Sequence, residues 1–96
     1  MKIPVHKTLV LTTHAVEYSI AIPANTATLS FQIREADTSI IYYFKSTAGQ
    51  PTGGNYFTLP GGSSKLIAPI TSGMTLYVQA QSNDGRTLEV EYITEQ

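Results

Sequence analysis

The stretch ATLSFQIR, residues 27–34, alternates apolar and polar side chains without interruption. Successive side chains of a β-strand point to opposite faces, so this period of two predicts a strand with one buried face. The apolar members of the stretch are Ala27, Leu29, Phe31 and Ile33.

The same period recurs along most of the chain. Residues 40–44 are apolar on both faces, which indicates a central strand or a strand covered on both sides. Gly- and Pro-containing stretches interrupt the alternation, and Asn83-Asp84-Gly85 has the composition of a tight β-hairpin turn. We expect seven or eight strands in all, including those at 16–22, 27–34, 40–44, 56–59, 64–67, 75–81 and 88–93.

Many short strands separated by turns are typical of an antiparallel β-sandwich or a small closed barrel. No window of the chain has helical spacing, and 96 residues suit one domain. We therefore expect a single all-β domain over residues 1–96, most simply a β-sandwich. The alternation does not distinguish two packed sheets from a closed barrel.

The composition favours association over charge-driven binding. Charged residues make up 14% of the chain, below the roughly 25% of typical soluble domains. Neutral polar side chains take their place, since the chain has 13 Thr and 8 Ser. The net charge of -1, without a basic run, argues against a nucleic-acid partner. No apolar run approaches the ~18 residues of a membrane span, and we expect synthesis in a cytoplasm without membrane association.

The residue types that carry chemistry do not form a recognisable constellation. His6 and His14 are the two histidines, and the chain has no cysteine, so we predict no metal site. Asp37 and Asp84 lie in expected turns, where Asp usually caps backbone amides. Glu89 and Glu91 alternate on one strand face as a solvated or partner-facing stripe. We expect no catalytic residue, no cofactor and no enzymatic activity.

Two groups of residues are candidates for a protein interface. Tyr43 and Tyr56 lie in aromatic stretches, and the pattern leaves open whether they line the core rim or an interface, where Tyr is enriched. Residues 1–7 have no visible partner, and we predict an extended arm that orders on a neighbouring subunit. Its candidate interface residues are Lys2, Ile3, Pro4 and Val5.

Four motifs bear a resemblance to a known class of proteins. They are LSFQIREAD (29–37), YFTLPGGSS (56–64), LYVQA (76–80) and TLEVEYI (87–93). With them, the span from Pro23 to Ile93 resembles small β-sandwich proteins of bacteriophage virions, such as capsid decoration (cement) proteins and head or tail accessory proteins. The resemblance implies jelly-roll-like sheets and homo-oligomers, often trimers, and offers no catalytic residues. The first 22 residues lie outside it, and we expect either an added strand pair or an arm exchanged between neighbours there.

The expected function follows from the resemblance, the low charge and the missing chemical constellation. We expect a virion structural protein that decorates a phage capsid as an oligomer, with a trimer favoured. Its partners would be the major capsid protein or other virion proteins. The alternative is a tail or receptor- or carbohydrate-binding accessory module, motivated by the Tyr-rich strands and neutral polar loops.

Overall fold

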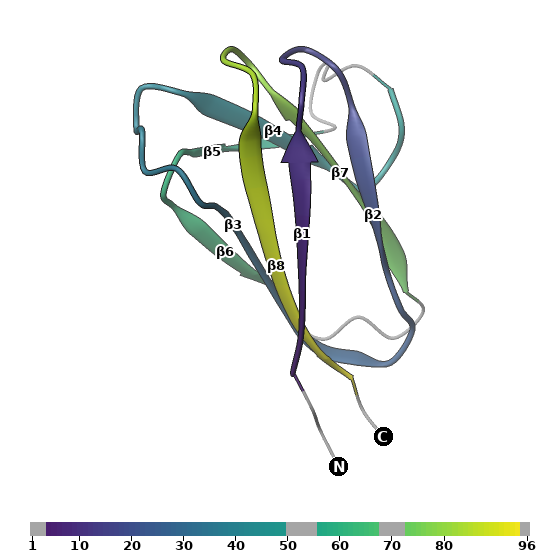
Figure 1. Ribbon diagram of the computed structural model, residues 1–96. Helices are drawn as coiled ribbons and strands as arrows, with labels where there is room; N and C mark the ends of the chain where they lie inside the picture. Colours follow the sequence, from purple (N-terminus) through teal and green to yellow (C-terminus); the bar gives the residue numbers. More distant parts are fainter. Residues whose placement is uncertain (1–3, 50–55, 68–72, 95–96) are drawn as a thin grey trace.

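The computed structural model describes residues 4–49, 56–67 and 73–94. Eight antiparallel strands in these residues form two four-stranded sheets that pack against each other (Figure 1). The all-β sandwich predicted from the alternation is confirmed, and the two separate sheets decide against a closed barrel. No helix in these residues is long and apolar enough to cross a membrane.

The strand order follows a jelly roll. Sheet A has the order β1-β8-β3-β6 and sheet B the order β2-β7-β4-β5. Consecutive strands therefore lie in opposite sheets except β4 and β5, which is the double Greek key of jelly rolls. The strands are β1 (Pro4–Leu11), β2 (Tyr18–Ile22), β3 (Thr26–Ile33), β4 (Ile41–Lys45), β5 (Phe57–Pro60), β6 (Ser64–Ile67), β7 (Met74–Ala80) and β8 (Arg86–Thr94).

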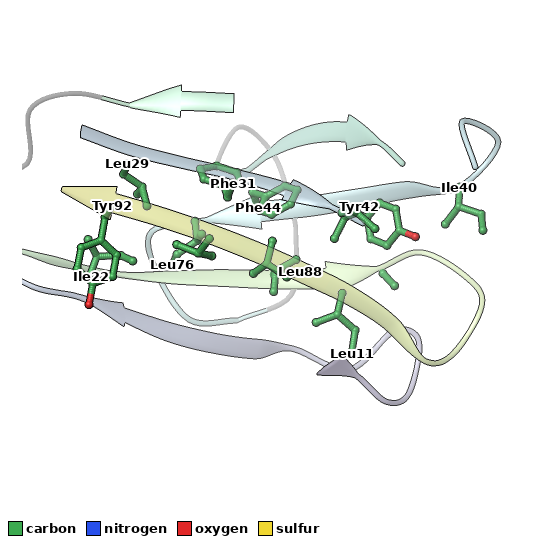
Figure 2. Close-up of a cluster of buried hydrophobic side chains, with 14 residues drawn as sticks. Leu11, Ile22, Leu29, Phe31, Ile40, Tyr42, Phe44, Leu76, Leu88 and Tyr92 are labelled. Atoms are coloured by element: carbon green, nitrogen blue, oxygen red, sulfur yellow. The ribbon is translucent and has the colours of Figure 1, made fainter. Parts of the chain in front are cut away.

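The core lies between the sheets and uses the predicted alternation. Leu29, Phe31 and Ile33 of β3 are buried, as are Leu88, Val90 and Tyr92 of β8. Figure 2 shows Leu29, Phe31, Leu88 and Tyr92 of these among side chains of the opposite sheet. An aromatic cluster joins the layers, with ring centroids 4.8 Å apart for Phe31 and Phe44 and 5.5 Å apart for Phe44 and Phe57. Dispersion and removal of apolar surface from water stabilise this packing.

Several strand predictions agree closely with the structure. β6 has the expected bounds, and β4 lies between β7 and β5 as a central strand. β2 begins at Tyr18, two residues later than expected, and the side chain of Val16 is exposed. The Asp37 carboxylate caps its own turn, as predicted, because Oδ1 accepts hydrogen bonds from the backbone N (3.1 Å) and Oγ (2.6 Å) of Ser39.

The predicted hairpin at Asn83-Asp84-Gly85 is wrong. The chain reverses there, and Gly85 has the expected positive φ of 77°, but the other residue with a positive φ is Asn83 (69°) and not Asp84. However, β7 pairs with β2 and β4, while β8 pairs with β1 and β3. The turn connects the two sheets and packs on the end of β1, since the Gly85 N donates to Leu11 O at 2.9 Å.

The predicted N-terminal arm is wrong for residues 4–7. These residues belong to β1, which pairs in register with β8 of the same chain from Pro4 opposite Ile93 to Leu11 opposite Arg86. Val5 packs against the core. Of the four arm residues proposed as an interface, Lys2 and Ile3 lie outside the described residues.

Candidate functional site

The outer face of sheet A carries a shallow polar groove of about 520 Å³. All four strands of the sheet contribute to it, because outward-facing positions of neighbouring strands lie side by side. Glu89 and Glu91 of β8 form its centre, as each pairs across with residues of both β1 and β3. The other polar residues that line it are His6, Lys7, Thr8, Ser30, Gln32, Arg34 and Ser64.

Ion pairs and hydrogen bonds fix the carboxylates of this groove. Glu91 Oε2 lies 2.7 Å from Nε2 of His6. Glu89 accepts hydrogen bonds from Gln32 Nε2 at 2.9 Å and from Arg34 Nε at 3.0 Å. The hydrogen bond from Gln32, followed by that from Arg34, holds the pKa of Glu89 below its ordinary value. The carboxylate is therefore ionised at neutral pH.

The outer face of sheet B carries a different surface, which we call the tyrosine patch. It consists of Ile41 and Tyr43 of β4, Thr58 and Pro60 of β5, and Tyr56 just before β5. Tyr43 pairs across with Thr58, and Ile41 with Pro60. The rings of Tyr43 and Tyr56 meet edge to face, with centroids 5.3 Å apart and planes at 82°. The structure thus brings the two predicted interface tyrosines together.

The patch combines exposure with fixed geometry. Tyr56 is 36% exposed and Ile41 is 37% exposed. The Tyr43 hydroxyl accepts a hydrogen bond from Gln81 Nε2 at 3.4 Å. The side chain is therefore anchored at its hydroxyl as well as at the backbone of β4. None of the five side chains of the patch carries a charge at neutral pH. Such surfaces, aromatic and free of charge, are typical of the centres of protein interfaces.

A buried ion pair lies close to this face. The Lys45 side chain is fully buried, and its Nζ lies 2.7 Å from Oε1 of Glu17. The Glu17 carboxylate also accepts from the backbone N of Gly49, at 3.2 Å to each oxygen. Glu17 therefore joins β4 to the segment that follows it. Because its side chain is fully buried, Lys45 adds no exposed charge of its own to the outer face of sheet B.

The other residues considered for catalysis or metal binding do not form a cluster in the described part of the chain. Asp84 Oδ1 lies 2.7 Å from both the backbone N and the ring Nδ1 of His14, so it caps the neighbouring connection. His6 lies in the groove on sheet A. Among residues 4–49, 56–67 and 73–94, no group of three or more His, Cys, Asp or Glu side chains could hold a metal ion.

The sequence singled out the two tyrosines and the glutamate stripe as candidates, but it did not predict the groove. The alternation of Glu89 and Glu91 placed both on one face. The groove depends on strand partners, since His6 precedes Glu91 by 85 residues and Arg34 precedes Glu89 by 55. No local signal in the sequence announces such pairings. A search of protein-family models and of curated proteins finds no match to the chain.

Proposed function

We propose that the chain is a structural protein of a bacteriophage virion, which decorates or cements the capsid as a homo-oligomer. It binds the major capsid protein or another virion protein and acts without catalysis or cofactor, after synthesis in the host cytoplasm. The motif resemblance between residues 23 and 93 supports this proposal. The jelly-roll strand order also supports it, because viral capsid domains share this architecture.

The observation that carries the proposal is the tyrosine patch. Tyr43 and Tyr56 present rigid aromatic area beside exposed Ile41, and few rotamers are lost when such side chains are buried. Neutral surroundings lower the cost of removing the patch from water. We assign contact with the capsid shell to this face.

The edges of sheet A suit face-to-face contact better than strand pairing. β1 and β6 are its edge strands, and each carries a lysine at a position that alternation directs toward the core side. Lys7 lies between Val5 and Leu9, which pack on the core, and Lys65 pairs across with buried Phe31. Inward-pointing lysines discourage edge-to-edge association. Subunits of the proposed homo-oligomer, with a trimer favoured, therefore meet through faces and not through these edges.

Co-sedimentation with undecorated capsids tests the proposal. We expect the chain to pellet with the shells, and the variants Tyr43→Ala and Tyr56→Ala to bind at least about tenfold more weakly, as loss of an interface anchor predicts. Leu66→Ala is the matched control, because Leu66 is 65% exposed but lies on β6 of the other sheet. Chain that stays in the supernatant with intact shells would contradict decoration.

The alternative is a tail or receptor- or carbohydrate-binding accessory module. The polar groove on sheet A favours it, since lectin domains also use jelly rolls. A glycan array separates the two functions. Binding to glycans without binding to capsids would replace the first proposal with the second.

A further inference from the structure

The groove on the outer face of sheet A has the size and rigidity of a ligand site. Its volume of about 520 Å³ lies within the range of small-molecule sites, roughly 300–1,000 Å³. The polar lining is carried by β1, β8, β3 and β6, whose ladder hydrogen bonds hold the side chains in fixed relative positions. Sites built on strands are more precise than sites built on loops.

The groove retains unused hydrogen-bonding capacity. An ionised carboxylate offers about four acceptor positions. Glu89 uses two of them, for Gln32 and Arg34, and Glu91 uses one for His6. The side chains of Glu91 and Arg34 are 50% and 55% exposed, so a ligand can reach them. The hydroxyls of Thr8, Ser30 and Ser64 add groups that both donate and accept.

The charges of the groove identify the class of ligand. Within the groove Glu89 is paired with Arg34 and Glu91 with His6, so both carboxylates already have basic partners and an ionic ligand would have to compete with them. Donors and acceptors alternate over the surface, and a sugar hydroxyl can do both at once. We propose that this groove binds a neutral oligosaccharide. The inference concerns a face distinct from the tyrosine patch, and it holds whether or not the chain decorates a capsid.

This groove would not bind a sugar by stacking its ring on an exposed aromatic side chain, as exposed tyrosines would. Phe31 is the aromatic residue of the lining, and its side chain is buried in the core. Recognition therefore depends on hydrogen bonds to carboxylates and hydroxyls. Binding should weaken when one of these groups loses its acceptor strength, and removal of tyrosines from the opposite sheet should leave it unaffected.

An NMR titration of the full chain tests the inference. The probes are linear hexasaccharides of β-1,4-glucose, α-1,4-glucose, mannose and N-acetylglucosamine, each added to about 10 mM to detect millimolar dissociation constants. We expect at least one probe to shift the backbone amides of β1, β3 and β8 around Glu89 and Glu91. The substitution Glu91→Gln should weaken that binding about tenfold, as loss of a charged acceptor predicts.

A matched pair of hydroxyl removals localises the site. Ser30→Ala lies in the groove and should weaken binding, whereas Ser19→Ala lies on β2 in sheet B and should not. The inference would be overturned if none of the four hexasaccharides shifted any backbone amide signal. Shifts confined to the amides of sheet B would also overturn it. Capsid co-sedimentation reports on the other face, so failure of one proposal is distinguishable from failure of the other.

Discussion

Lys45 Nζ lies 2.7 Å from Glu17 Oε1, and the Lys45 side chain is fully buried while that of Glu17 is 22% exposed. Removing an ammonium group from water costs several kcal/mol unless an opposite charge lies close to it. Glu17 supplies that charge from the segment before β2, across the outer side of sheet B. The pair therefore couples two segments that are 28 residues apart. Because only Lys45 is fully buried, losing one partner does not have the same effect on stability as losing the other.

Breaking this pair from the Glu17 side should destabilise the fold more than breaking it from the Lys45 side. Glu17→Gln leaves a buried ammonium without a counter-charge, and we expect a loss of about 2–3 kcal/mol in the free energy of unfolding. Lys45→Met leaves a carboxylate that water can still reach, and the loss should be about 1 kcal/mol.

Urea unfolding of both variants and the double variant measures the asymmetry. The double variant should recover part of the loss of Glu17→Gln, because the unpaired charge is gone. A Glu17→Gln variant as stable as the parent chain would show that water or another group already satisfies Lys45.

Stability should fall in acid. Lys45, the largest cause, holds the pKa of Glu17 below its ordinary value of 4.5. The pKa values of Asp37, Asp84 and Glu89 are lowered by hydrogen bonds from Ser39, His14 and Gln32. A carboxylate with a lowered pKa stabilises the fold above its unfolded-state pKa and loses that contribution as pH falls through its folded-state pKa.

Urea unfolding as a function of pH measures this effect. These carboxylates should contribute a constant stabilisation from pH 7 to about pH 5, and stability should decline progressively below about pH 4.5. Glu17→Gln should make the decline shallower. A free energy of unfolding that stays level to about pH 3 would contradict the pairing of these carboxylates.

Gly61 should tolerate no side chain. A Cβ at this buried position would lie 2.5 Å from the backbone O of Asp37 and 2.8 Å from that of Glu35. We expect Gly61→Ala to destabilise the fold by more than about 2 kcal/mol, because backbone must move to admit it. In Gly85→Ala the added Cβ meets no atom within 4 Å, so only the cost of the positive φ applies, about 1 kcal/mol.

Thermal unfolding compares the two glycine variants directly. Gly61→Ala should lower the melting temperature clearly more than Gly85→Ala does. Equal effects would mean that the turn at 35–37 can shift freely away from Gly61.

Deleting residues 1–7 should destabilise the domain. The deletion removes half of β1, including Val5, which packs on the core, and its pairing with Tyr92 of β8. Amide hydrogen exchange should show loss of protection in β8 as its outer neighbour is removed. Unchanged exchange and stability would restore the view that these residues act as a separate arm.

The sequence predicted the parts of this fold that depend on local alternation. β8 and the later part of β3 bury the expected side chains because a period of two is set by strand geometry itself, but the register shift between Thr26 and Thr28 buries Thr26 in place of the expected Ala27. The composition of Asn83-Asp84-Gly85 correctly predicted a reversal with positive φ at Gly85, but it predicted neither the positive φ of Asn83 nor the sheet that the chain enters next. A turn signal carries no information about distant strand partners, and both errors, the hairpin and the arm, concern partners of β8.

The candidate sites divide in the same way. The sequence marked Tyr43 and Tyr56 as candidates for either the core rim or an interface, and their edge-to-face contact depends on the pairing of β4 with β5. The burial of Lys45 had no local signal in the sequence. It requires the carboxylate of Glu17, which directly precedes β2, a different strand of the same sheet. The groove on sheet A likewise required the register of β1 and β3 against β8.

Electron cryomicroscopy of undecorated capsids mixed with the chain tests the central claim most directly. We predict additional density of the size of the two-sheet sandwich at regular positions on the shell, with the β4–β5 face of sheet B turned toward the capsid protein. Shells that remain bare at saturating concentrations of folded chain would contradict the account.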